Sequence, residues 1–396
     1  MHITIIVGGR FHAFDLAYQL QKKKINYKLI TSYPLFALKK FSLTSKHVET
    51  IFVKEILKRF FDKFRFISRL FDYNYWLSCY FSKKASDLIN YSKTDILVGW
   101  SGFSYHSFKK AQKFNCIKIL ERGSTHIMHQ VEILKEEYKK LKLEATLPSK
   151  KTIESEIKEY ELADYICVPS EFVKKSFIDR GFNKNKIIKI PYGVDIKNFK
   201  PDINKLSAEK KKFIIISTGS VSVRKGSIYL LKAFIELNIP NSELIFVGKI
   251  DDEVKRIIAK FSKIKNIKFY KKQPQSKLSA FYNKADIFIL FSLEEGLSMV
   301  QIQAMACGLP VICTYNTGGS EIVDHGVNGF ILPIRDINLL KKKILILYKN
   351  RSLLKKMKHN SFIKARRLFS WELYGEKIIK FYKKILNKKK QFKVAI

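Results

Sequence analysis

The sequence Glu-Glu-Gly-Leu-Ser-Met-Val-Gln-Ile-Gln-Ala-Met-Ala-Cys-Gly-Leu-Pro-Val-Ile at residues 294–312 sets the expectation for the fold. It follows an apolar run at 286–291, which predicts a buried strand ending in a polar loop. Residues 299–307 have the composition of a helix, and the Gly-Leu-Pro at 308–310 ends that helix before the next apolar run. The stretch therefore predicts strand, loop, helix and strand, which is the repeating unit of a parallel sheet.

Short apolar runs of the same kind recur along the chain and alternate with segments of helical period. The expected strands are 3–7, 27–31, 96–99, 117–120, 165–168 and 187–190, followed by 213–217, 243–247, 267–270, 286–291, 310–313 and 330–332. This alternation predicts an α/β protein in which helices cover both faces of parallel sheets.

The length of the chain predicts two such domains. A chain of 396 residues is longer than the roughly 250–300 residues at which a single hydrophobic core usually stops growing. The stretch 191–201 begins Pro-Tyr-Gly-Val-Asp and interrupts both patterns, so we expect the hinge there. The prediction is an N-terminal domain over residues 1–194 and a C-terminal domain over residues 195–371. Ligands of open α/β sheets bind beyond the carboxyl ends of the strands, so the loops that follow strands are the informative ones.

The composition is strongly basic, with 75 Lys and Arg against 35 Asp and Glu and a net charge of +40. Such a field attracts nucleoside diphosphates, anionic lipid surfaces or nucleic acid. Nucleic acid is not expected as a partner, since the sequence contains no recognisable nucleic-acid-binding module. The five cysteines lack metal-type spacing and predict reduced thiols in a cytoplasmic protein. No apolar run approaches the roughly 18 residues of a membrane span, and the N-terminal run predicts a first strand and not a signal peptide.

The loop at residues 217–226 follows a predicted strand and precedes a helical segment. Gly219 permits an unusual turn, and the small side chain of Ser220 leaves backbone N–H groups open to a phosphate. Arg224 and Lys225 add a planar fork and a point charge, which suit a diphosphate. A solvated basic pair beside a helix start explains the same residues, so both interpretations stay open.

The loop at residues 292–298 precedes the helix predicted over 299–307. Its helix N-terminus presents unpaired N–H groups toward an anion. Glu295 accepts hydrogen bonds from sugar hydroxyls in this interpretation, and Gln303 binds a ribose diol. The alternatives are an acid that stabilises a helix N-terminus and an ordinary polar helix position. The further donor-binding residues expected here are Gly296, Leu297, Ser298 and Met299.

With these motifs the chain resembles the retaining glycosyltransferases of the GT-B fold, of the family-4 (glycosyl transferases group 1) type. The resemblance is densest over 294–330, includes Val168-Pro169-Ser170, the stretch 190–201 and the Arg224-Lys225-Gly226 loop, and is weakest between about 32 and 92. It implies two Rossmann-like domains whose parallel sheets face a central cleft. It also implies that a C-terminal helix, 372–396, crosses back to pack on the first domain.

The same resemblance implies retaining transfer of a sugar from a nucleoside-diphosphate sugar, a UDP- or GDP-sugar, to a hydroxyl acceptor. The acceptor class includes lipid-linked acceptors, and the implied setting is glycolipid, polysaccharide or other cell-surface glycan synthesis. No metal and no further cofactor is required, because basic side chains and a helix N-terminus neutralise the diphosphate. The sequence departs from the family at Gln303, where the family carries Glu, and at Ser220, where many members carry Arg.

In the N-terminal half, two loops follow predicted strands. Gly8 and Gly9 let the backbone approach the donor phosphate or the acceptor, although a tight turn explains them too. The resemblance places His126, in the loop 121–126, beside the reacting sugar. His12 and His129 are interpreted as local polar residues.

The segment 53–71 interleaves basic and aromatic residues at partly helical spacing. One interpretation is a helix lying on an anionic membrane surface, which makes the protein cytoplasmic and peripheral on the inner membrane face. The other is a domain helix that buries its aromatic residues in the core.

Two other functions remain open at this point. One is a different reaction on the GT-B fold, such as nucleotide-sugar epimerisation, and the other is a non-catalytic protein that binds nucleotide sugar or membrane.

Overall fold

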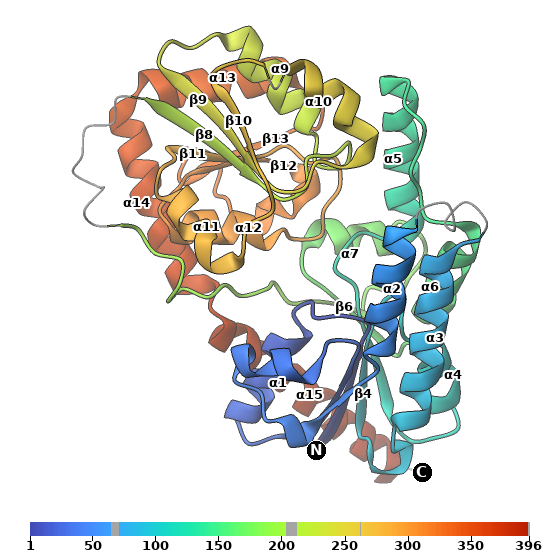
Figure 1. The fold of residues 1–396 in the computed structure, drawn as a ribbon. Helices are drawn as coiled ribbons and strands as arrows, with labels where there is room; N and C mark the ends of the chain where they lie inside the picture. Colours follow the sequence, from blue (N-terminus) through green and yellow to red (C-terminus); the bar gives the residue numbers. More distant parts are fainter. Residues whose placement is uncertain (65–70, 203–211, 262, 395–396) are drawn as a thin grey trace.

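The computed structural model describes residues 1–64, 71–202, 212–261 and 263–394, which form two α/β domains (Figure 1). Within these residues a seven-stranded sheet has the order β3-β2-β1-β4-β5-β6-β7, and a six-stranded sheet has the order β10-β9-β8-β11-β12-β13. Every strand pair in both sheets is parallel. The predicted fold class, two Rossmann-like domains, is therefore confirmed.

The N-terminal strands are β1 (His2–Val7), β2 (Asn26–Thr31), β3 (Val48–Thr50), β4 (Ile96–Trp100), β5 (Ile117–Glu121), β6 (Tyr165–Val168) and β7 (Ile187–Lys189). The C-terminal strands are β8 (Phe213–Thr218), β9 (Ser242–Val247), β10 (Ile267–Tyr270), β11 (Ile287–Leu290), β12 (Val311–Thr314) and β13 (Gly329–Leu332). The central strands are buried on both faces, which is why they appear in the sequence as continuous apolar runs. The edge strand β3 was missed, because three residues are too few to show a pattern.

The helices of the N-terminal domain are α1 (Ala13–Lys22), α2 (Val53–Lys63), α3 (Tyr73–Leu88), α4 (Tyr105–Ala111), α5 (Ile127–Leu141), α6 (Lys150–Leu162) and α7 (Glu171–Ile178). Those that follow are α9 (Ser227–Leu237), α10 (Lys255–Phe261), α11 (Gln275–Tyr282), α12 (Met299–Ala306), α13 (Ile337–Lys349), α14 (Arg351–Leu368) and α15 (Trp371–Val394). The helix predicted over 299–307 is α12, which ends just before Gly308 in a left-handed conformation (φ +82°).

The chain crosses between the domains at two places that lie side by side. Val194 donates its backbone N–H to the carbonyl of Phe369 at 2.7 Å. A Cβ atom on Gly193 would lie only 2.6 Å from the backbone nitrogen of Trp371, so the two segments touch backbone to backbone. After this crossing, α15 runs along the N-terminal domain beside α1 (Figure 1), with Lys22 paired to Glu372. The crossing back of the C-terminal helix is thus confirmed.

Helix α5 follows an N-terminal strand but also packs against the C-terminal domain (Figure 1). Its Leu134 and Tyr138 belong to the hydrophobic cluster formed by β8, β9 and α9. Glu137 pairs with Arg335 at 2.6 Å and accepts a hydrogen bond from the hydroxyl of Tyr229. No pattern in the sequence distinguishes this helix from the others, so its bridging role was not predicted.

Helix α2 exposes several of the apolar residues in the segment 53–71, for which the sequence left two interpretations open. Val53, Ile56 and Phe60 are 46%, 50% and 50% exposed, whereas Lys54 is buried. Of the two aromatic residues of α2, Phe60 is exposed and does not fit the core interpretation, whereas Phe61 is partly buried and packs against Tyr73 and Trp76 of α3. The part of the segment at 65–70 lies outside the described residues. In the part of the chain that the structure describes, no helix is both long and apolar enough to cross a membrane.

Candidate active site

The two loops singled out in the C-terminal half meet at the carboxyl ends of neighbouring strands. Strands β8 and β11 pair directly, so the loops that follow them leave the same edge of the sheet. Lys225 Nζ lies 2.6 Å from Glu295 Oε1, and an Nη atom of Arg224 lies 3.5 Å from the same oxygen. The side chains of Lys225 and Glu295 are only 15% and 10% exposed, so this pair is largely shielded from water. The structure thus brings together three of the four residues predicted to be catalytic.

Glycines allow the two loops to approach this closely. Gly226 has a left-handed backbone (φ +61°), and a Cβ atom there would lie 2.0 Å from the carbonyl oxygen of Phe291. Gly219 also has positive φ (+120°), which agrees with the unusual turn predicted for it, and the Lys225 side chain lies over it. The hydroxyl of Ser220 donates to that of Ser222, so the loop is held by its own side chains.

Glu294, the residue before the predicted site residue Glu295, is bound by residues of both domains. Its side chain is fully buried and accepts hydrogen bonds from both the backbone N–H and the hydroxyl of Thr125, each at 2.9 Å. Arg224 donates its Nε–H to the same carboxylate at 2.9 Å. Burial acts to raise the pKa of Glu294, but Arg224 and the donors of Thr125 hold that pKa below its ordinary value. Glu294 is therefore an ionised carboxylate bound by both domains.

Arg224 is committed to this interaction. It also donates to Ser124 Oγ at 3.2 Å, and Glu295 and Glu294 raise the pKa of its guanidinium against the effect of burial. Its proposed contact with the diphosphate remains a prediction, because two carboxylates already hold its guanidinium group. The pairing of Arg224 with Glu294 has no signal in the sequence, because the two residues lie 70 positions apart in the chain, and Thr125 lies 169 positions from Glu294.

The loop before α12 is wedged against the N-terminal domain. A Cβ atom on Gly296 would lie 1.9 Å from the carbonyl oxygen of Gly123, and Ser170 Oγ donates to the Gly296 carbonyl at 2.6 Å. Ser298 stands at the N-cap of α12 without a side-chain capping bond. The residues Leu297 and Met299 are buried and partly buried in the core beside it. The N-terminus of α12 thus lies at the junction of the two domains.

Gln303 is buried inside the C-terminal domain. Its amide oxygen accepts a hydrogen bond from the hydroxyl of Tyr282 at 3.4 Å, and Tyr282 also contacts the hydroxyl of Thr218 at 2.8 Å. Thr218 is the last residue of β8, next to Gly219, so Gln303 lies behind the predicted diphosphate loop. Its contact with ribose remains a prediction.

His126 is the N-cap of α5, and its side chain is directed into the core of the N-terminal domain. Its Nδ1 accepts a hydrogen bond from the backbone N–H of Met128, and its ring packs against Tyr160, Phe177 and Phe182. Burial, followed by the charges of Arg180 and Arg122, lowers the pKa of His126 to about 3. Its contact with the sugar stays a prediction. The residues of this loop that do reach the C-terminal domain are Ser124 and Thr125, which sequence reasoning missed.

The loop after β1 is held within the N-terminal domain. The carbonyl of Gly9 accepts a hydrogen bond from Thr31, and that of Gly8 accepts one from Lys54 Nζ at 2.7 Å. A Cβ atom on Gly8 would overlap the ring of Phe103, so this glycine is needed for packing. The structure brings Gly9 into no described contact with Lys225 or Glu295, and its role at the donor stays a prediction.

Two of the histidines were interpreted as local polar residues. His12 is buried, and its Nε2 lies 3.1 Å from Glu121 Oε2. His129 lies within reach of Arg180. Among the described residues, no group of three or more His, Cys, Asp or Glu side chains could hold a metal ion.

Comparison with known protein families identifies the half of the chain that carries these loops. Residues 198–364 match the family described as glycosyl transferases group 1. The C-terminal half contains a group 1 glycosyltransferase domain. This group 1 domain includes Lys225, Glu295 and Gln303, whereas Thr125 and His126 lie outside the matched range.

Curated relatives of the group 1 domain are themselves glycosyltransferases. The capsular polysaccharide biosynthesis glycosyltransferase CapM of Staphylococcus aureus is 28% identical over 57% of this chain and 62% of the relative. The UDP-Gal:alpha-D-GlcNAc-diphosphoundecaprenol alpha-1,3-galactosyltransferase of Escherichia coli is 28% identical over 44% of this chain and 48% of the relative. The chain thus spans less than two thirds of the length of each.

A solved structure extends the likeness to the whole chain. HepE of Anabaena, in complex with UDP-glucose, superposes with a TM-score of 0.69 over 97% of this chain and 100% of HepE, at 17% sequence identity. At this identity the likeness establishes the fold, and the two Rossmann-like domains are a GT-B arrangement.

Removing one donor from Glu294 tests whether it joins the domains. We expect Thr125→Val to lower the free energy of unfolding by about 1–3 kcal/mol, because a buried carboxylate loses a hydrogen bond. Thr125→Ser keeps the hydroxyl and is the matched control. Chemical denaturation of the three proteins measures the effect, and equal stability of the Val and Ser variants would contradict it.

The neutral state of His126 has a consequence for stability at acid pH. Its pKa is about 3 in the folded protein and 6.5 in the unfolded chain, so between these values the unfolded chain binds more protons. Acidification from about pH 7 to about pH 5 should therefore destabilise the wild type more than His126→Asn. The Asn side chain keeps a cap acceptor but does not titrate. An unchanged stability difference at the two pH values would show that His126 is not held neutral.

Proposed function

We propose that the protein transfers a glycosyl group from a nucleoside-diphosphate sugar, a UDP- or GDP-sugar, to a hydroxyl acceptor. The observation that carries this proposal is the shielded Lys225–Glu295 pair at the carboxyl ends of β8 and β11, next to the N-terminus of α12. A cation, a carboxylate and unpaired backbone N–H groups in one place suit a donor with a diphosphate and sugar hydroxyls. The relatives of the group 1 domain support the same reaction class.

In this proposal the donor rearranges the contacts of Lys225. An incoming diphosphate competes with Glu295 for the Lys225 ammonium, and Glu295 Oε1 is then free to accept a hydrogen bond from a sugar hydroxyl. Lys225, with Arg224 behind it, stabilises the negative charge that develops on the departing diphosphate. Backbone N–H groups near Gly219 and Ser220 and at the start of α12 contribute to the same charge, and no metal is required.

We propose that the anomeric configuration is retained. No carboxylate has been assigned as a covalent nucleophile, so the proposal is attack from the face that the diphosphate leaves, with the leaving oxygen assisting deprotonation of the acceptor. His126 orients the sugar and the acceptor only if its loop turns toward the cleft, and Gln303 binds the ribose. The wedging of the loop before α12 against Gly123 supports alignment of donor and acceptor between the domains.

The acceptor is proposed to be lipid-linked and the protein to act on the cytoplasmic face of a membrane, in glycolipid, polysaccharide or other cell-surface glycan synthesis. The Escherichia coli relative acts, by its name, on a diphosphoundecaprenol-linked sugar. In this protein the net charge of +40 favours an anionic surface, and α2 exposes apolar residues next to exposed basic ones. Helix α2 would lie on the bilayer with its apolar face inward.

Substitution of the shielded pair tests the transfer reaction. We expect Lys225→Ala and Glu295→Ala each to reduce kcat for sugar transfer by about 10²-fold or more, since each removes a charge placed at the reacting group. Lys232→Ala, on the exposed side of α9, is the control. Transfer from a panel of UDP- and GDP-sugars into an acceptor extract is measured by release of the nucleoside diphosphate.

Two results would oppose this proposal. Near-wild-type transfer by both variants would exclude the assigned site. Conversion of the donor sugar into its epimer without any acceptor would favour nucleotide-sugar epimerisation instead.

Membrane binding by α2 is tested by co-sedimentation with vesicles. We expect Phe60→Asp to reduce binding to vesicles rich in phosphatidylglycerol by about tenfold, because the exposed ring that would enter the bilayer is replaced by a negative charge. Ile363→Asp alters an equally exposed apolar residue on α14 and is the matched control. Binding that is equal for neutral and anionic vesicles, or insensitive to Phe60→Asp, would refute this part of the proposal.

A further inference from the structure

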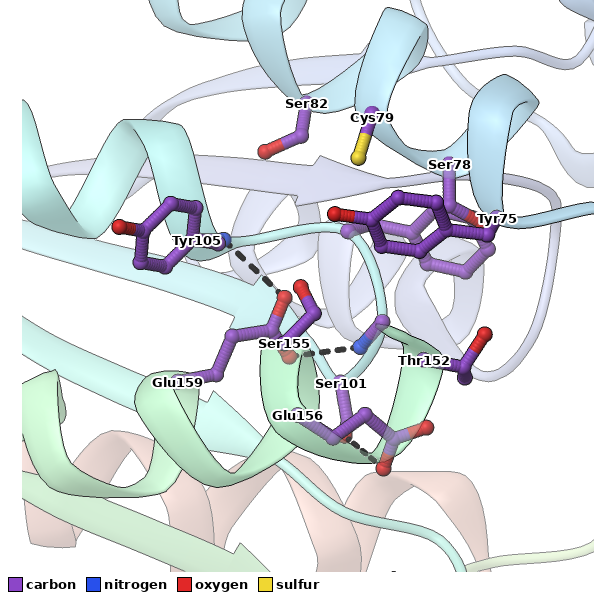
Figure 2. Close-up of a pocket in the computed structure, with 12 residues that line it drawn as sticks. Tyr75, Ser78, Cys79, Ser82, Ser101, Tyr105, Thr152, Ser155, Glu156 and Glu159 are labelled. Atoms are coloured by element: carbon purple, nitrogen blue, oxygen red, sulfur yellow. Dashed lines mark hydrogen bonds between the residues drawn. The ribbon is translucent and has the colours of Figure 1, made fainter. Parts of the chain in front are cut away.

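A separate cavity lies within the N-terminal domain, at the carboxyl end of β4. It has a volume of about 210 Å³ and lies between α3, the loop after β4 and the first turns of α6 (Figure 2). Tyr75 and Tyr105 lie on opposite sides of it, with α3 above and α6 below in this view. Nothing in the donor site accounts for this cavity, since none of its lining residues belongs to the group 1 domain.

The lining of the cavity is rich in hydroxyl groups and contains a carboxylate oxygen without a partner. Glu156 is 8% exposed, and its Oε2 accepts hydrogen bonds from Ser101, Arg122 and Tyr160. No described residue donates a hydrogen bond to its Oε1, which lies in the cavity (Figure 2). Such an oxygen accepts a hydrogen bond from a ligand hydroxyl without further rearrangement.

The floor of the cavity is held by the hydrogen bonds of two buried carboxyl side chains, Glu156 and Glu159. Glu159 accepts backbone N–H groups from Gly102, Ser104 and Tyr105 at 2.6–3.0 Å, which fixes the loop after β4. Burial, followed by the charge of Glu156, raises the pKa of Glu159 to about 8, whereas the three backbone donors act to lower it. Glu156 is paired with Arg122 at 2.5 Å. A polar but uncharged group, such as a sugar ring between two aromatic residues, fits this interior.

The mouth of the cavity is basic. An adjoining hollow of about 320 Å³ shares Tyr75, Tyr105 and two further residues with the cavity. It adds Lys83, Lys151 and Lys158, with Glu154 as its acid, and all four side chains are exposed. A net positive mouth over a hydroxyl-lined interior suits a ligand whose uncharged ring carries an anionic group at one end.

Arg122 links the lining of the cavity to the proposed donor site by hydrogen bonds. This guanidinium donates to Glu156 Oε2 on one side and, through Nε, to the carbonyl of Thr125 on the other. Thr125 in turn binds Glu294, the neighbour of Glu295. Phe61 of α2 packs against Tyr73 and Trp76 of α3, so the proposed membrane-binding helix is a neighbour of the helix whose Tyr75 lines the cavity.

We propose that this cavity binds the glycosyl or cyclitol ring of a phosphorylated acceptor, with ring hydroxyls at Glu156 Oε1 and the phosphate at the lysines of the mouth. The inference deepens the proposed function, because it names the class of acceptor that the transferase takes. The ring stacks between Tyr75 and Tyr105. Its phosphate comes either from a lipid headgroup that reaches in from the bilayer or from a free sugar phosphate.

Calorimetric titration tests the cavity directly. The probes are inositol 1-phosphate, glucose 1-phosphate and N-acetylglucosamine 1-phosphate, with inositol, the neutral sugars and inorganic phosphate as references. We expect at least one phosphorylated ring to bind about tenfold or more tightly than both its neutral ring and phosphate alone. If phosphate alone binds as tightly, the cavity is not a ring site and the proposal fails.

Two variants test whether the phosphorylated ring binds in this cavity. Lys158→Glu should weaken the phosphorylated ring about tenfold, whereas Lys342→Glu, an exposed lysine of α13, should not. Ser155→Tyr fills the cavity and should abolish binding, with UDP binding and thermal melting used to verify the fold. No saturable binding of any phosphorylated ring, or binding unchanged in both cavity variants, would overturn the proposal.

The outcomes separate this inference from the proposed function. If the wild-type protein binds a phosphorylated ring but transfers no sugar from any UDP- or GDP-sugar, the cavity is still a ring-binding site and the proposed transferase activity is wrong. Vesicles that contain phosphatidylinositol or phosphatidylglycerol distinguish the two sources. A lipid headgroup is indicated if the protein binds phosphatidylinositol vesicles more tightly than phosphatidylglycerol vesicles and Ser155→Tyr removes the difference. A free sugar phosphate or inositol phosphate is indicated if the two vesicles bind equally while a soluble phosphorylated ring binds tightly.

Discussion

The arrangement of the two domains depends on one buried carboxylate, that of Glu294. An ionised group without water is costly unless donors surround it, and here the donors come from Thr125 in one domain and Arg224 in the other. Separating the domains would leave the carboxylate with Arg224 but without the two bonds from Thr125. The contact therefore sets the distance between the loop after β5 and the loop after β11, which carries Glu295. Everything proposed for the cleft follows from that distance.

Close backbone contacts make this arrangement specific. At Gly226 and Gly296 the chain comes so near to another carbonyl that any side chain would collide with it, so each loop fits in one position only. Helix α5 reinforces the arrangement from the other side, because it leaves the N-terminal sheet and packs with Leu134 and Tyr138 against the C-terminal core. The two domains thus share both hydrogen bonds to a buried carboxylate and an apolar contact, and motion between them must break or reorganise both.

The N-terminal domain gathers the features that we propose bind the acceptor. Helix α2 exposes apolar residues and packs on α3 through its Phe61. The hydroxyl-lined cavity opens between α3 and α6. A basic surface, an apolar helix face and this cavity lie next to one another, which is an order suited to a molecule with a lipid end and a hydroxylated end. Arg122 then joins the cavity to Thr125 and so to the donor loops.

The sequence by itself determined the fold class, the central strands and the two loops that we propose bind the donor. Those strands are buried on both faces and so appear as apolar runs, and the loops carry glycines and charged residues within a few positions of a strand end. Patterns of this kind involve residues close together in the chain, so they can be recognised in a single sequence. Only the tertiary structure decided what the charged residues contact: Arg224 binds Glu294, and the ring of His126 lies in an aromatic core. Those contacts join residues far apart in the chain, and the preference of a buried charge for its partners acts through space and leaves no period or spacing in the sequence.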